Sequence, residues 1–313
     1  MKMGNGALSF SEKERICETL FECNGPFWHL YTDGTSMQNI FRNENDFNTG
    51  MWLLAASWCI AERVQILTFE LMSNHIHVVL SGQRGACLNL FETFKSKIKR
   101  SFIKAGHCID WTRFKAEIIP IESLQALRNE IIYVNRNAFV ANAAYTPDSY
   151  LWGGGCAYFN LWTKYLNTIP IHCLKINKQR EILHSRDVTP YAELKAINGM
   201  VYIPSFCDIA LGESLFRDAR SYFNSLTRNA EAFSQIAARL KDIVFLTDDE
   251  LYSVTITYIN NQYNIRSTNL LNSQQKIDVA RHLHINYNAS NQQLRRLLRL
   301  ELAVLNELFP QAQ

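Results

Sequence analysis

The feature that most constrains the fold is a pair of β-rich segments separated by two turn-forming residues. Val64–Met72 and His75–Ser81 are both rich in β-branched and other apolar side chains, and Ser73-Asn74 lies between them. Two such segments joined by so short a turn predict a β-hairpin.

Segments on either side extend this pattern. Strands are predicted over Phe27–Asp33 and Ala116–Ile121. Helices are predicted over Glu44–Arg63, Cys87–Ala105 and Glu122–Asn137. The last helix has apolar residues at 3-4-3 spacing, which is typical of one buried face. The order is β-α-β-β-α-β-α, whose first six elements match the ferredoxin-like split βαβ arrangement, so the sequence predicts an α+β fold.

The rest of the chain predicts two further regions. The run Gly153–Gly155 is a flexible break, and we expect the first domain to be 1–165. Residues 166–244 form a connecting region to which no chemistry is assigned. The region 245–313 is predicted to be helical, with a capping-box pattern at Thr247–Glu250 that precedes a helix.

The end of this last region resembles a helix-turn-helix. Its first helix is expected over Ser273–Leu283, and a recognition helix over Ser290–Leu300 within a last helix that continues to Phe309. Side chains that commonly contact bases and phosphates lie on it: Gln292, Gln293, Arg295, Arg296 and Arg299. An ordinary helical bundle with a solvated arginine face explains the same pattern equally well.

Composition excludes several classes of protein. Of 313 residues 47% are hydrophobic and 19% charged, which is typical of a globular protein with a core. The apolar stretch Met51–Ile60 is too short to span a bilayer, and Met1–Ser11 has no apolar run. We expect a cytoplasmic protein without membrane contact. Its eight cysteines, none in C-x-x-C spacing, suit a reducing compartment and are interpreted as structural.

Positive charge is concentrated in one stretch, although the net charge is only +3. Between Phe94 and Lys115 the only acidic residue is Asp110. The cations proposed to contact DNA here are Lys95, Lys97, Lys99, Arg100, Lys104 and Arg113. Such a cluster is expected where a protein binds a phosphate backbone, and equally where a helix face is simply solvated.

Two histidines lie at alternate positions of a predicted strand. His75 and His77 therefore point to the same face, about 7 Å apart, or twice the rise of roughly 3.3 Å per residue. Two imidazoles so placed can share a metal ion, although solvated polar residues give the same pattern. His282 and His284 repeat this spacing in a predicted helix, where they diverge by about 200° and are not expected to bind one ion.

A tyrosine and an asparagine share a face of the helix Glu122–Asn137. Tyr133 and Asn137 are four residues apart, and Asn129 lies one turn earlier on the same face. Taken alone, a tyrosine in this position is more often a residue at the rim of a core than a nucleophile.

Together these segments resemble the HUH single-tyrosine transposases, and especially their REP-associated branch. Leu71–Leu80 is similar to the M-P-N-H-V-H-L-L-L hairpin, and Tyr133–Ala141 to the Y-I-x-x-N-P-V-R-A helix. Ile40–Asp46, Trp111–Ile119 and Pro147–Trp152 resemble three further segments in the family's order. The resemblance covers roughly residues 27–165, and it departs from the family at Ser73 and Ala138, where prolines are usual.

The resemblance implies a specific chemistry. His75 and His77 would bind Mg²⁺ or Mn²⁺ with Asn137 as an oxygen ligand, and Tyr133 would attack the scissile phosphate of single-stranded or hairpin DNA. The product would be a 5′-phosphotyrosine whose stored energy permits rejoining. Trp111 is expected to stack on bases. Such a protein would associate with the nucleoid, and the family includes both monomers and dimers that exchange the tyrosine helix.

Three other interpretations stay open. The first is a DNA-binding regulator whose HUH domain is inactive. The second is a metal-dependent phosphodiesterase that uses the histidine pair and water. The third is an α/β domain with a helical interaction tail, which explains the composition but not the ordered motifs.

Overall fold

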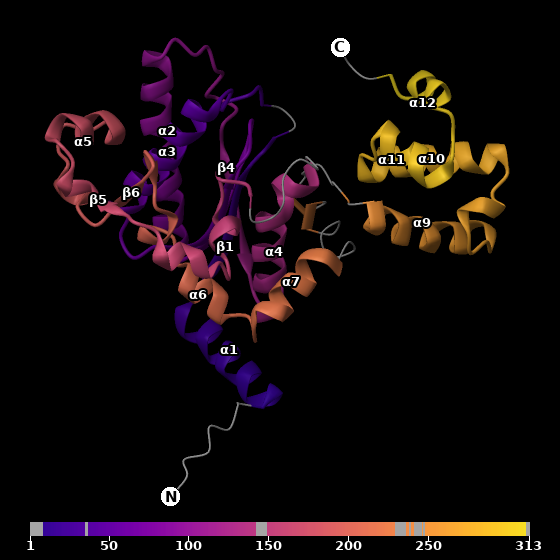
Figure 1. Ribbon diagram of the computed structural model, residues 1–313, viewed down its shortest axis with the longest axis horizontal. Helices are drawn as coiled ribbons and strands as arrows, with labels where there is room; N and C mark the ends of the chain where they lie inside the picture. The colour runs from indigo at the N-terminus through magenta and orange to yellow at the C-terminus, as the bar shows by residue number, and fades with distance from the viewer. Residues whose placement is uncertain are drawn as a thin grey trace, which may run out of the picture. The chain divides into compact units, whose positions relative to one another are not determined.

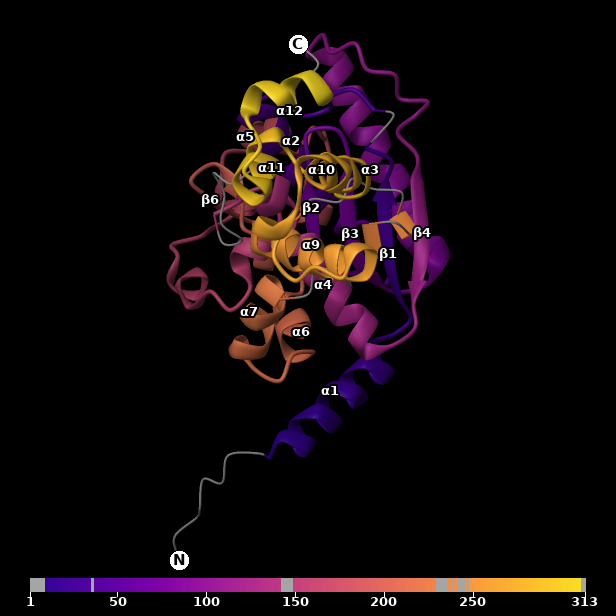
Figure 2. The same cartoon turned by 90° about the vertical axis from the view of Figure 1, so that its right-hand side faces the viewer.

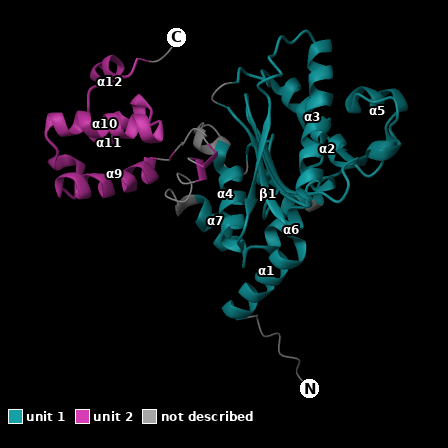
Figure 3. Cartoon of the chain, turned by 180° about the vertical axis from the view of Figure 1, so that it is seen from behind, with its two compact units in different colours: residues 1–226 teal, residues 227–313 magenta. Residues whose placement is uncertain are grey.

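The computed structural model divides the chain into two compact units, residues 1–226 and 227–313 (Figure 3). The structure describes residues 9–34, 37–141, 149–228, 236–237, 239–240, 246 and 248–310. Residues 166–226, predicted as part of a separate connecting region, belong to the first unit.

The first unit is built on an antiparallel sheet of four strands. They are β1 (Phe27–Thr32), β2 (Gln65–Leu71), β3 (Ile76–Ser81) and β4 (Ala116–Ile121). Their order is β2-β3-β1-β4, as Figure 2 shows. The predicted hairpin is confirmed, since β2 pairs with β3 and the Met72 amide donates to the His75 carbonyl at 2.9 Å. The chain is thus of the predicted α+β class.

Helices cover both faces of this sheet. On one face lie α2 (Glu44–Trp58) and α3 (Arg84–Lys104), and on the other lies α4 (Leu124–Ala141) (Figure 1). Consecutive strand side chains point to opposite faces, so strands that are buried throughout, such as β3, need cover on both sides. A further helix, α1 (Phe10–Asn24), was not predicted.

The edge strand β2 is covered by later parts of the chain. The Asp208 amide donates to the Ile66 carbonyl at 2.7 Å, and the Leu71 amide donates to the Trp152 carbonyl at 2.9 Å. Unpaired strand edges invite association with other chains, and this cover removes that hazard. The covering region contains β5 (Ile169–Pro170), β6 (Lys195–Ile197), β7 (Met200–Val201), α5 (Ile176–Leu183), α6 (Ile209–Ser214) and α7 (Ala219–Arg228).

The second unit is helical where it is described. It contains α9 (Asp248–Tyr263), α10 (Ser273–Tyr287), α11 (Asn291–Leu298) and α12 (Leu302–Leu308) around an apolar core. Ser290, where the recognition helix was expected to begin, is the N-cap of α11 and forms a capping box with Gln293. The expected continuous last helix is wrong, because Arg299 adopts a left-handed conformation (φ 53°) that ends α11. The predicted cap Thr247 lies outside the described residues.

The structure also bears on the expectations about membrane contact and about the cysteines. Within the described ranges, none of the helices combines the length and apolarity needed to cross a membrane. The eight cysteines, all within the described ranges, form no disulfide bonds.

Candidate functional site

The candidate site lies on the face of the sheet that α4 covers. His77 of β3 pairs in register with Tyr31 of β1, so both side chains and that of His29 share this face. His77 is completely buried. Its Nδ1 is 3.0 Å from Nε2 of His29, whose Nδ1 is 2.7 Å from the Glu130 carboxylate of α4. Sequence analysis missed His29 and Glu130, although polar residues at alternate positions of a buried strand were a visible signal.

His75 is oriented by the turn of the hairpin. The Asn74 side-chain amide donates to the Gly34 carbonyl at 2.7 Å, which fixes its oxygen toward His75 Nδ1, also at 2.7 Å. His75 Nδ1 must then carry the proton, and its Nε2 keeps the lone pair that a metal needs. A side chain at Gly34 would collide with this ring, since an added Cβ lies 2.6 Å from His75 Nδ1.

The structure brings Tyr133 to the histidine pair. The centroid of its ring lies 5.6 Å from that of His77, and the His75 and His77 centroids are 5.0 Å apart. A second tyrosine, Tyr31, has its ring centroid 6.4 Å from that of His77. Its hydroxyl donates to the exposed Glu117 carboxylate at 2.7 Å, so this side of the site borders solvent. Tyr31 is a second candidate nucleophile that sequence analysis did not identify.

Asn137, the predicted third ligand, is buried near the end of α4. Its Nδ2 has no hydrogen-bond partner within the part of the chain that the structure describes. An amide turned by half a rotation presents its oxygen at the same place, and an oxygen there suits a metal better than an unsatisfied N–H. In the described ranges, no group of three His, Cys, Asp or Glu side chains could hold a metal ion. The predicted metal site therefore needs the Asn137 amide as a third ligand beside the two histidines.

Buried polar contacts hold α4 in place. Asn135 accepts a hydrogen bond from Thr68 of β2 and donates one to the Tyr222 hydroxyl of α7 at 2.9 Å. At the other end Arg128 forms two hydrogen bonds with Glu14 of α1, at 2.7 and 3.2 Å. The helix that carries Tyr133 is therefore fixed to the sheet of its own chain.

The predicted basic cluster lies elsewhere. It is carried by α3, on the face of the sheet opposite to α4 (Figure 1). Lys97 donates to the Tyr191 hydroxyl at 3.1 Å, whereas Lys99, Arg100 and Lys104 are exposed. The cluster does not line the site beside Tyr133.

Two other residues of the first unit were also predicted to contact DNA. One forms an ion pair and the other lies in the core. Arg113 lies 3.3 Å from Asp110 in an exposed ion pair. Trp111 is only 6% exposed and packs against Phe102 and Phe114. The expectation that Trp111 stacks on bases is therefore wrong, because its rings are used in the core.

In the second unit the predicted contact residues divide into two groups. Arg296 forms two hydrogen bonds with the Asp248 carboxylate, at 2.7 and 3.0 Å, and these lower the pKa of Asp248. Gln293 donates to the Leu246 carbonyl at 2.8 Å. Gln292, Arg295 and Arg299 are exposed, and Arg296 is exposed as well despite its ion pair.

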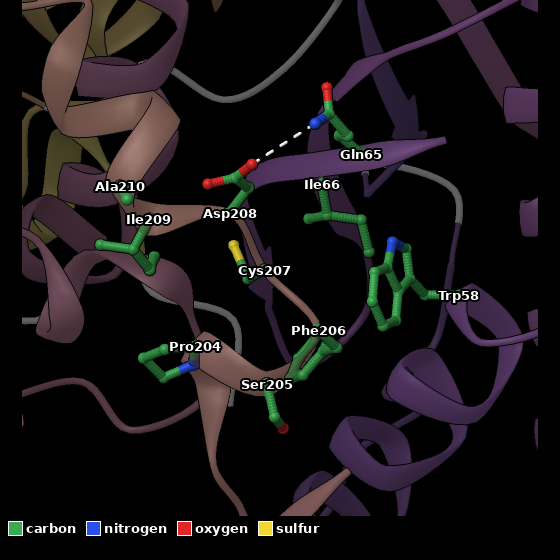
Figure 4. A pocket seen from close by; sticks show the side chains of 10 residues that line it. All are labelled: Trp58, Gln65, Ile66, Pro204, Ser205, Phe206, Cys207, Asp208, Ile209 and Ala210. Atoms are coloured by element: carbon green, nitrogen blue, oxygen red, sulfur yellow. Dashed lines mark hydrogen bonds between the residues drawn. The ribbon is translucent and has the colours of Figure 1, made fainter. Parts of the chain in front are cut away.

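A cavity of about 320 Å³ lies at the opposite end of β2 from the histidines (Figure 4). It is lined by Trp58, Gln65, Ile66 and residues 204–210. Its only carboxylate, Asp208, caps α6 by accepting from the Leu211 amide at 2.9 Å. Residues suited to catalysis do not converge there, so the histidine site is the stronger candidate.

No protein-family model, curated protein or solved structure matches the chain. The function must therefore be argued from the site itself.

Proposed function

We propose that the chain cuts and rejoins single-stranded DNA through a tyrosine nucleophile, in the manner of the HUH single-tyrosine transposases. One observation carries the proposal. The hairpin turn, β3 and α4 bring together two histidines, one of which donates its Nδ1 proton to Asn74, and the ring of Tyr133. The strand order β2-β3-β1-β4, with helices after β1 and β3, supports a ferredoxin-like arrangement for this unit.

The donor set suits a hard divalent cation with open coordination positions. His75, His77 and the Asn137 amide would hold Mg²⁺ or Mn²⁺, leaving positions for water and a phosphate oxygen. When bound, such an ion polarises the phosphoryl group and offsets its developing negative charge.

The chain's own residues supply the nucleophile. The Tyr133 hydroxyl oxygen would form a bond to phosphorus while the bond from phosphorus to the 3′-oxygen breaks. The phenol proton is lost, and the departing 3′-oxygen takes up a proton. The products are a 5′-phosphotyrosine and a free 3′-hydroxyl, and the reverse attack by a 3′-hydroxyl rejoins the strand. Because polar contacts attach α4 to β2 and α1 of the same chain, we propose that Tyr133 acts in cis.

The second unit is proposed to bind DNA. A three-residue turn joins α10 to the short helix α11, which exposes Gln292 and Arg295. This arrangement supports a helix-turn-helix, with Arg299 as a further phosphate contact. Arg296 is a weaker candidate because Asp248 already neutralises it.

A second candidate function is a DNA-binding regulator that does not cleave. One observation favours it: the nucleophile is almost enclosed, with Tyr133 only 5% exposed. Cleavage would then require the site to open when DNA binds.

The test is a denaturing gel of the protein with hairpin-bearing single-stranded DNA labelled at its 3′ end, with and without Mn²⁺. We expect a slow band in which protein is attached to the label. Tyr133→Phe should abolish it, because only the nucleophilic oxygen is removed, and should leave DNA binding unchanged.

Tyr31→Phe is the matched control, since it removes the hydroxyl of the other tyrosine whose ring lies near His77. Loss of the adduct in Tyr31→Phe but not in Tyr133→Phe would transfer the nucleophile to β1. Tight binding without adduct in any of these proteins would favour the regulator.

A further inference from the structure

Three buried side chains form a continuous chain of hydrogen bonds that ends at His77. Glu130 Oε2 lies 2.7 Å from His29 Nδ1, and His29 Nε2 lies 3.0 Å from His77 Nδ1. None of these side chains is more than 1% exposed. Apolar residues of similar size would stabilise such a site at least as well, so stability alone does not explain a carboxylate and two imidazoles here.

The direction of the protons along this chain follows from the chemistry of each group. An ionised carboxylate only accepts hydrogen bonds, so His29 Nδ1 is the donor to Glu130. A neutral imidazole carries one proton, so His29 Nε2 is then an acceptor. His77 Nδ1 must donate to it, and the lone pair of His77 lies on Nε2.

The same tautomer arises at the other histidine by a different route. Asn74 accepts from His75 Nδ1, which leaves the lone pair on His75 Nε2. Two unrelated sets of residues, one in the hairpin turn and one spanning β1 and α4, thus present the same nitrogen of both rings.

We infer that Glu130 and His29 are positioning residues that select the metal-binding tautomer of His77. The inference rests on the proposed function in one respect only, namely that the ligand bound by the lone pair of His77 Nε2 is a metal ion. Without Glu130, His29 is free to carry its proton on Nε2 and to donate it toward His77 Nδ1. That change would place the His77 proton on Nε2 and block coordination there.

The tautomer can be measured without any metal. Long-range ¹H–¹⁵N correlation spectra of the full chain, labelled with ¹⁵N-histidine, distinguish a protonated ring nitrogen from one that carries a lone pair. We expect wild-type His77 to be protonated at Nδ1. In Glu130→Leu the His77 proton should move to Nε2, whereas Glu130→Gln keeps an acceptor oxygen and should preserve the wild-type tautomer.

Metal affinity gives the second readout. Partners that orient metal-binding histidines typically contribute 10- to 100-fold in affinity, so Mn²⁺ binding to Glu130→Leu, followed by electron paramagnetic resonance, should weaken by about that factor. Asn135→Leu is the matched control, because it removes a buried polar contact of α4 outside the chain that ends at His77. It should lower stability without changing the His77 tautomer.

The outcomes separate this inference from the proposed function. A wild-type His77 protonated at Nε2, or equal Mn²⁺ affinity in wild type and Glu130→Leu, would overturn the role of Glu130 and His29. A wild-type protein with the expected tautomer but no Mn²⁺ binding would overturn the metal site and leave the hydrogen-bonded chain intact.

Discussion

The chain contains the same His-x-His pattern twice, in regions with different backbones. His75 and His77 flank the start of β3, where alternate side chains share a face, and their ring centroids lie 5.0 Å apart. His282 and His284 lie in α10, where alternate side chains diverge. Residue type and spacing are identical, so the backbone alone decides whether the two imidazoles meet.

The surroundings reinforce the difference. Each histidine of the first pair has a hydrogen-bond partner on Nδ1, which is Asn74 for His75 and His29 for His77. In the second pair the rings stack on separate aromatic side chains. The ring centroid of His282 is 3.8 Å from that of Tyr258, and that of His284 is 4.1 Å from that of Phe309. Nδ1 has a partner in the second pair too, since His284 donates to the Ala289 carbonyl at 3.0 Å and His282 accepts from the Asn286 amide at 3.1 Å. The diverging backbone and the stacking therefore distinguish the second pair from the first.

The strongest test removes each pair in turn. His75→Ala with His77→Ala should abolish measurable Mn²⁺ binding, because both nitrogen ligands are lost. His282→Ala with His284→Ala should leave it unchanged while lowering the stability of the second unit. Isothermal titration of each double variant with Mn²⁺ measures this directly, and loss of binding in the second variant alone would assign the metal to α10.

A smaller effect is expected from moving one ring without removing it. Gly34→Ala places a methyl group 2.6 Å from His75 Nδ1, so the ring must shift away from its bond with Asn74. We expect Mn²⁺ affinity to fall by about 10- to 100-fold, as for other losses of an orienting contact.

Gly85→Ala is the control for this substitution. Gly85 lies in the first turn of α3, and an added Cβ there meets nothing within 4 Å. Affinity should not change, and stability should rise slightly because alanine favours the helix. If Gly34→Ala bound Mn²⁺ as tightly as Gly85→Ala does, the orientation of His75 would not matter for binding.

Much of the framework was accessible from the sequence because its signals are local. The four strands of the main sheet and the helices α2, α3 and α4 lie close to where residue composition, turn residues and, for α4, 3-4-3 spacing predicted them. In contrast, α1 was missed, although Ser9 and Glu12 form a capping box at its start. A capping pattern without a strong apolar face is easily read as a loop.

The site was predictable only in part, for a physical reason. His75 and His77 are recognisable because they are neighbours in sequence. The contact of His29 with Glu130 joins residues 101 positions apart, and no local pattern indicates it. The segment 206–208 likewise covers the edge strand β2, which lies more than a hundred residues earlier in the chain, so no local pattern predicts this contact. Arg299 ends α11, and no glycine or proline at this position indicates the break in the sequence.

The smallest expected effect concerns pH and the helical histidine pair. Burial against Tyr258 lowers the pKa of His282 below its ordinary 6.5. The unfolded chain therefore binds a proton at a higher pH than the folded chain does. Folding should be most stable above the ordinary pKa, and this contribution should be lost as the pH falls from 6.5 to the lower folded value.

His282→Phe should make that loss smaller, since phenylalanine keeps the stacking and does not titrate. Urea denaturation of the full chain at about pH 7.5 and about pH 5.5 compares the two proteins across the relevant range. The wild type should lose more stability on acidification than His282→Phe does. The same loss in both proteins would mean that His282 is solvated in the folded state. The stacking that distinguishes the second pair would then rest on His284 and Phe309 alone.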